Sequence, residues 1–237
     1  MSPRSLALLI DGLEHAFSQT PKPSVIAGCP CCVDEHELAA LLSTPRRRLT
    51  AEQLAPYGGK VLNTVGSPQD LRYFAPRLLE LSVCDSSFYP SLELLFQKLT
   101  TADWRSWPEA PAIAALLAAL WDDVLNNEAS WVDPGTLLCA LAAAEEPLRV
   151  RLTEWGRFTN PAAVESLHDF LTGDVEVRRG RIVPSNAFWD RTCLPYAELC
   201  AWLNDGAAAA AAALAFEAHD SDDIRELLIE IHGMVGG

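Results

Sequence analysis

The amino-acid sequence predicts an all-α protein, an irregular multi-helix domain of HEAT-like type, with at most one short β-hairpin near residues 175–183. Apolar residues recur at helical spacing along most of the 237-residue chain, and proline or glycine separates the periodic segments. Short helices joined by short turns are typical of helical-repeat arrays, but no fixed period is present. We therefore predict a single helical domain over residues 1–237 rather than a regular solenoid.

Helix starts in the N-terminal part are predicted from capping residues and prolines. Apolar residues from Leu6 to Phe17 recur at helical spacing, and this helix is expected to end near Ser18, before Pro21. Capping boxes and prolines supply the later starts because they satisfy or remove the free amides of a first helical turn. These starts are Asp34 with Glu37, Thr50 with Gln53, Pro68 and Pro90.

The second half repeats this pattern and adds the one predicted hairpin. Residues 175–183 alternate apolar and polar side chains about Gly180, which is typical of two short strands and a turn. The alanine run 207–213 is a strong helix former. The other predicted helices start at Pro108 or Pro111, at Asp133-Pro134 and at Asn160-Pro161, or run through Leu199 to Leu203 and Ile224 to Ile231.

The charge distribution argues against nucleic-acid binding. The formal net charge is −14, and residues 101–237 carry 9 basic against 22 acidic side chains, whereas residues 1–100 are near neutral, with 9 against 10. The basic runs Arg46–Arg48 and Arg178–Arg181 are short and lack interleaved aromatic residues. We thus distinguish a near-neutral subregion 1–100 from an acidic subregion 101–237, and expect no nucleic-acid partner.

Hydropathy and cysteine usage predict a cytoplasmic protein that does not bind membranes. No stretch approaches the ~20 apolar residues that span a bilayer, and the apolar N-terminal run is interrupted by Asp11. The seven cysteines are an odd number, and their spacing is not that of a disulfide framework. This usage favours a reducing compartment.

The densest group of reactive side chains is the tetrapeptide Cys29-Pro30-Cys31-Cys32, directly before a predicted helix. Two thiolates spaced C-x-x-C bind one tetrahedral zinc ion from a tight turn. The sequence predicts zinc ligands at Cys29, Cys32 and His36, because a helix that begins at Asp34 returns His36 toward the turn. Cys31, Cys84 and the Cys193/Cys200 pair are further candidates, none at a diagnostic spacing.

Two other interpretations of the cysteine cluster stay open. The C-P-x-C spacing also occurs in glutaredoxin-like redox sites, although the strands of such a fold are not predicted here. Alternatively, the cysteines are small, partly buried side chains at a turn and have no chemistry.

Several segments resemble a family of uncharacterised bacterial proteins, over most of residues 25–125. They are Cys29-x-x-Cys32, Leu49–Leu54 with Tyr57, Asp70–Leu81 with its Tyr-Phe-Ala-Pro-Arg core, Trp104-x-x-Trp107-Pro108 and Ala119–Trp121. The resemblance implies a structural or site role for Cys29 and Cys32, with Cys31 as an additional cysteine, and implies no particular activity.

The predicted role is that of a protein–protein interaction or scaffold module with a structural zinc site and an unidentified protein partner. Neither a glycine-rich phosphate loop nor a G-x-S-x-G nucleophile elbow occurs in the chain, which favours a role other than catalysis. The alternative is a thiol- or metal-dependent enzyme that uses the Cys29–Cys32 cluster.

Overall fold

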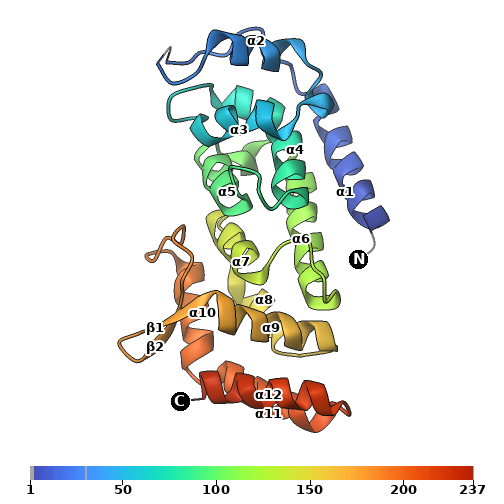
Figure 1. Cartoon of the computed structure of the whole chain (residues 1–237), viewed down its shortest axis with the longest axis vertical. Helices are drawn as coiled ribbons and strands as arrows, with labels where there is room; N and C mark the ends of the chain where they lie inside the picture. The colour runs from blue at the N-terminus through green and yellow to red at the C-terminus, as the bar shows by residue number, and fades with distance from the viewer. Residues whose placement is uncertain (1–2, 30, 237) are drawn as a thin grey trace. The chain divides into compact units, whose positions relative to one another are not determined.

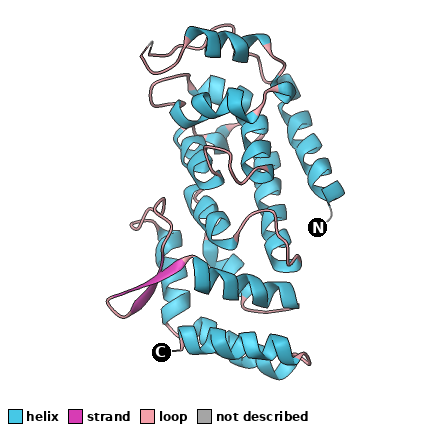
Figure 2. Ribbon diagram, viewed as in Figure 1, coloured by secondary structure: helices cyan, strands magenta, loops and turns pink. Residues whose placement is uncertain are grey.

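A computed structural model describes residues 3–29 and 31–236, so Pro30 of the cysteine motif lies outside the described residues. Twelve α-helices, three short 3-10 helices and one two-stranded sheet form this described part (Figures 1 and 2), which confirms the all-α prediction. The α-helices are α1 Pro3–Ala16, α2 Glu35–Ser43, α3 Ala51–Lys60, α4 Pro68–Cys84, α5 Leu92–Thr101, α6 Ala110–Asn126, α7 Pro134–Ala143, α8 Leu148–Trp155, α9 Pro161–Gly173, α10 Leu194–Asn204, α11 Ala207–Ala218 and α12 Asp222–Val235. The 3-10 helices are η1 Phe17–Gln19, η2 Arg46–Arg48 and η3 Trp104–Ser106.

The predicted capping residues begin their helices as expected. Asp34 and Glu37 form a capping box at α2, in which the Asp34 carboxylate accepts from the His36 amide at 2.6 Å. Thr50 and Gln53 form a second box at α3. Prolines occupy the first turns of α4, α7 and α9, where the missing amide costs no hydrogen bond. Local sequence therefore positions these five helix starts.

The chain divides into two compact units, one made of the described residues up to Leu117 and the other of those from Ala118 onward. In the first unit, α1, α3 and α5 pack against α4. The α4 side chains Leu71, Phe74 and Leu78 are fully buried, and each such side chain contributes about 1.5–3 kcal/mol to the free energy of unfolding. This core supports the loop between α3 and α4, to which the loop before α2 that carries the cysteine cluster is hydrogen-bonded.

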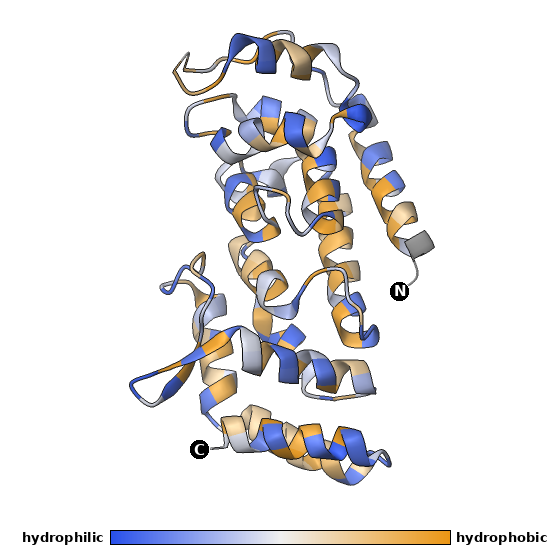
Figure 3. Ribbon diagram, in the orientation of Figure 1, coloured by the Kyte–Doolittle hydropathy of each residue, from blue (hydrophilic) through white to orange (hydrophobic). Residues whose placement is uncertain are grey.

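In the second unit, Trp155 of α8 is at the centre of an aromatic cluster. Its ring stacks on Trp202 of α10 and meets Trp121 of α6 edge-on, at centroid distances of 6.0 and 5.6 Å. Beside it, α12 packs against α9 and α11. Figure 3 shows both hydrophilic and hydrophobic residues along α12, and the buried ones recur at helical spacing, so one face of the helix packs against the core.

The predicted hairpin is present as β1 Val175–Arg178 and β2 Arg181–Pro184, with Val177 opposite Ile182. Arg179 and Gly180 both have positive φ, 52° and 75°, as a two-residue type I′ turn requires. An isolated hairpin is marginally stable in water. Here the Asn204 side chain of α10 bonds both the amide and the carbonyl of Ile182, at 2.9 and 2.8 Å, and attaches the hairpin to the helices.

Asp174, directly after α9, carries a carboxyl group whose pKa is raised to about 6. Its partial burial is the main cause and the nearby Asp133 carboxylate adds to it, while a hydrogen bond from the Gly135 amide acts in the opposite direction. The Asp174 side chain packs tightly against Gly135, because a Cβ built on Gly135 would lie 2.4 Å from Asp174 Cγ. The charged carboxylate therefore destabilises the folded state above pH 6.

We expect Asp174→Asn to stabilise the protein at pH 8 by about 1 kcal/mol. The effect is no larger because the Asp174 carboxyl group is only partly buried and solvent screens its charge. Because the folded-state pKa is raised, the destabilisation is full above about pH 6 and disappears as the pH falls toward the unfolded-state value. Urea unfolding of both proteins at pH 8 and pH 4 measures the difference. Equal stabilisation at the two pH values would contradict this assignment.

No single helix in residues 3–29 and 31–236 is long and apolar enough to cross a membrane. The pair α10 and α11 meets the length and composition criteria only when taken together, with a bend of 53° between the two helices.

Candidate metal centre

The cysteine cluster lies on a loop that is attached to the connection between α3 and α4. The Cys29 amide donates to the Thr64 carbonyl at 2.9 Å, and the Gly66 amide donates to the Ala27 carbonyl at 2.7 Å. Between these bonds, Gly28 forms an antiparallel bridge with Val65. A Cβ on Gly28 would lie 3.1 Å from a Val65 methyl group, so glycine permits this close approach.

Three contacts hold the cysteine turn itself. The amides of Cys32 and Val33 both donate to the Cys29 carbonyl, at 2.9 and 3.2 Å, and the Lys60 amine at the end of α3 donates to the Cys32 carbonyl. Val33 is only 5% exposed and anchors the C-terminal side of the turn in the core. The turn is thereby held by two local backbone bonds and by one side chain, Lys60, that is distant in the sequence.

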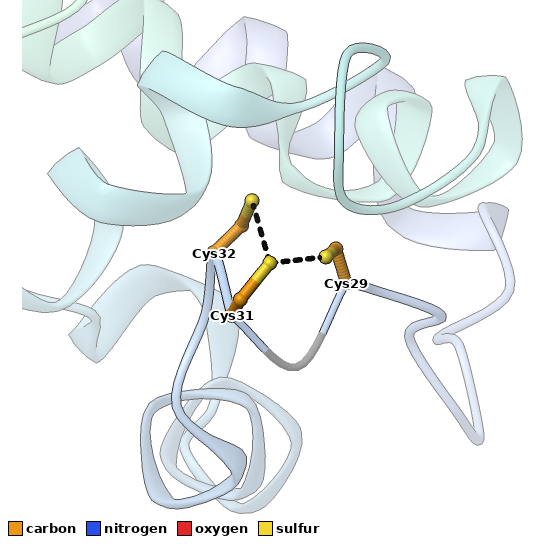
Figure 4. A group of neighbouring side chains, drawn as sticks. All are labelled: Cys29, Cys31 and Cys32. Atoms are coloured by element: carbon orange, nitrogen blue, oxygen red, sulfur yellow. Dashed lines mark hydrogen bonds between the residues drawn. The ribbon is translucent and has the colours of Figure 1, made fainter.

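The three thiols converge at this turn. The sulfur atoms of Cys29, Cys31 and Cys32 all lie within 4.8 Å of one another, close enough to hold one metal ion. Figure 4 shows the Cys31 sulfur between the other two, at 2.8 Å from Cys29 Sγ and 3.9 Å from Cys32 Sγ. Cys31 is exposed, whereas Cys29 and Cys32 are partly exposed. The group is therefore accessible from solvent.

Hydrogen bonding within the cluster separates the acidities of two thiols. The pKa of Cys29 is lowered, first by the hydrogen bond from the Cys31 thiol and then by the Cys31 amide. The pKa of Cys31 is raised to about 11, first because its proton is held by Cys29 and then because it also bonds Cys32. Backbone amides directed at one sulfur stabilise a thiolate there, which is the form that binds metals.

The structure extends the predicted ligand set in one respect. Cys31, which the resemblance treats as an additional cysteine, is a member of the converging group. The sequence indicates this membership of Cys31, because a cysteine adjacent to Cys32 must share the same turn. The contributions of Lys60 and Thr64 had no sequence signal, since both depend on tertiary contact.

The remaining candidates lie outside the three-thiol group. His36 is in the first turn of α2, with an exposed side chain, and its role as a ligand stays a prediction. Cys84 is a free cysteine with an exposed side chain, and its pKa is raised, mainly because neighbouring protein atoms desolvate the thiol. Cys193 and Cys200 are also free, and the Cys193 sulfur accepts from the Tyr196 amide at the start of α10. Within the described residues, no histidine, further cysteine or carboxylate lies close enough to the three thiols to be a fourth member of the group.

Comparisons of this chain with protein-family models, with curated proteins and with solved structures find no significant match. The function is therefore inferred from the geometry of the chain itself.

Proposed function

We propose that this chain is a helical protein-interaction module whose N-terminal loop binds one zinc ion through Cys29, Cys31 and Cys32. The observation that carries this proposal is the convergence of three solvent-accessible sulfur atoms within 4.8 Å on an anchored turn. Three thiolates form a soft ligand set, which selects zinc and other thiophilic ions over magnesium or calcium.

The sulfur positions are compatible with a tetrahedral ion after small side-chain movements. Zn–S bonds of about 2.3 Å place two ligating sulfurs about 3.8 Å apart. The Cys31–Cys32 separation of 3.9 Å is close to this value. The Cys29–Cys31 separation of 2.8 Å has to widen by about 1 Å, which rotation about the Cα–Cβ bonds permits.

Structural zinc sites have four protein ligands, and we propose that His36, which is not a member of the converging group, closes the site as the fourth. It follows Cys32 by four residues, on the first turn of the helix that the cysteine loop enters. A site closed by His36 would be structural and would fix α2 to the loop, as a scaffold module requires. The net charge of −14 favours a partner with a basic surface.

The second candidate is a metal-dependent enzyme, and one observation favours it. Only three thiols converge in the described part of the chain, and catalytic zinc sites keep three protein ligands and one open position. The identity of the fourth ligand distinguishes the two roles.

Titration with Co²⁺ tests both the site and its fourth ligand. We expect one Co²⁺ per chain, with thiolate charge-transfer absorption that decreases in each of Cys29→Ser, Cys31→Ser and Cys32→Ser. Cys84→Ser is the matched control and should bind as the wild type does, because Cys84 lies outside the cluster.

The visible bands of bound Co²⁺ report the fourth position. His36→Ala should change their energy if histidine closes the site, and added small anions should change them in the wild type if that position is open. Absence of charge-transfer absorption in the wild type would refute the metal site.

A further inference from the structure

The two closest sulfur atoms in the cluster suggest a second chemistry for the same turn. We propose that Cys29 and Cys31 exchange between a dithiol and a disulfide with low-molecular-weight disulfides such as glutathione disulfide, and that this oxidation releases the bound metal. The metal-release part rests on the proposed function, whereas the exchange reaction does not.

The positions of the sulfurs identify the pair. Cys29 Sγ and Cys31 Sγ are 2.8 Å apart, between the about 2.05 Å of a disulfide bond and the about 3.8 Å of two zinc ligands. The turn that holds them is fixed without a metal, by the Cys29 amide bond to Thr64 and by the Cys32 and Val33 amide bonds to the Cys29 carbonyl. Closing the bond thus requires a movement of less than about 1 Å.

Two other pairings are less favourable. Cys31 and Cys32 are adjacent, so their Cα atoms are about 3.8 Å apart. This is below the Cα–Cα distance of roughly 4.4–6.8 Å that disulfides usually span. Their sulfurs are also farther apart, at 3.9 Å. Cys84 is exposed but lies outside the converging group, so it has no thiol of that group beside it with which to close a disulfide.

The exchange is balanced in two steps. The Cys29 thiolate attacks one sulfur of the external disulfide, whose S–S bond breaks and releases one thiolate with the electron pair. Cys31 then loses its proton to solvent and attacks Cys29 Sγ, which forms the Cys29–Cys31 disulfide and expels the second external thiolate. The two cysteines are oxidised and the external disulfide is reduced to two thiols. The opposite order of attack gives the same product.

Metal release follows from the loss of ligands. A disulfide sulfur carries no negative charge and is a poor zinc ligand compared with a thiolate. Oxidation of Cys29 and Cys31 leaves Cys32 as the sole thiolate of the three. The solvent exposure of Cys31 allows an external disulfide to reach the pair.

Treatment of the full chain with glutathione disulfide, followed by intact-mass and peptide analysis, tests the proposal. Chelator-treated wild type, Cys32→Ser and Cys84→Ser should each lose two hydrogens and yield the Cys29–Cys31 disulfide. Cys29→Ser and Cys31→Ser should instead retain a glutathione adduct on the remaining thiol of the Cys29–Cys31 pair. A wild-type protein that forms no internal disulfide, or one that maps to Cys29–Cys32, would overturn the proposal.

The zinc-loaded protein separates this inference from the proposed function. A chromogenic chelator should detect one zinc ion released for each disulfide formed. If the disulfide forms and no zinc had bound, the metal site fails and the exchange reaction stands. If zinc binds and stays bound while the disulfide forms, the coupling between oxidation and release is refuted.

Discussion

Arg46→Ala is expected to lower the free energy of unfolding by about 3–5 kcal/mol, because it leaves a buried carboxylate without its partner. The Arg46 guanidinium, 9% exposed, bonds both carboxylate oxygens of Glu14, which is 7% exposed. It also donates to the Tyr73 carbonyl at 2.9 Å and lies over the Tyr73 ring. The residue therefore connects α1, η2 and α4, and urea unfolding followed by circular dichroism measures its contribution.

The neighbouring Arg47 supplies a matched control. Arg47 pairs with Asp11 on the surface, where both side chains are about 60% exposed, so Arg47→Ala should change stability by less than about 1 kcal/mol. The double variant Arg46→Met/Glu14→Leu should recover most of the loss, since no charge remains buried and unpaired. Equal effects of Arg46→Ala and Arg47→Ala would show that burial does not govern these ion pairs.

Trp155→Ala is expected to destabilise the second unit by a similar amount, about 3–5 kcal/mol. The Trp155 side chain is fully buried, and its indole N–H donates to the Ala163 carbonyl and the Ser166 hydroxyl, at 3.0 and 2.9 Å. Truncation opens a cavity among three other aromatic rings and leaves both acceptors without this donor. Thermal unfolding followed by far-ultraviolet circular dichroism is the appropriate measurement.

Trp155→Phe distinguishes packing from hydrogen bonding. Phenylalanine retains a ring for the stack on Trp202 and removes only the donor and part of the volume, so we expect a loss of about 1–2 kcal/mol. A loss as large as that of Trp155→Ala would assign the contribution to the hydrogen bonds rather than to the rings.

Helix starts with a local signal could be predicted from the sequence, and those without one could not. The capping boxes at Asp34 and Thr50 act within one helical turn. By contrast, α8 begins after Pro147 with no side-chain cap of its own. Its first amides, those of Leu148 and Arg149, donate to Glu198 of α10 at 2.8 and 3.2 Å. A cap supplied from fifty residues away leaves no local pattern.

The cysteine site also has one part that could be predicted from the sequence and another that could not. The cluster of cysteines is visible in the sequence because Cys29, Cys31 and Cys32 are within four residues. The arrangement of their sulfurs depends on the bridge between Gly28 and Val65 and on the Lys60 amine, which come from α3 and the loop after it. These contacts anchor the turn on which the three thiols converge, and no spacing rule for C-x-x-C motifs includes them.

Metal content measured by mass spectrometry tests the central claim most directly. The protein is purified without chelator or metal-affinity resin, as wild type, as Cys29→Ser/Cys32→Ser and as the control Cys84→Ser. The account predicts one zinc ion per chain in the wild type and in the control, and none in the double variant, with a lower melting temperature. A wild-type protein without metal, or a double variant that retains its zinc, would contradict it.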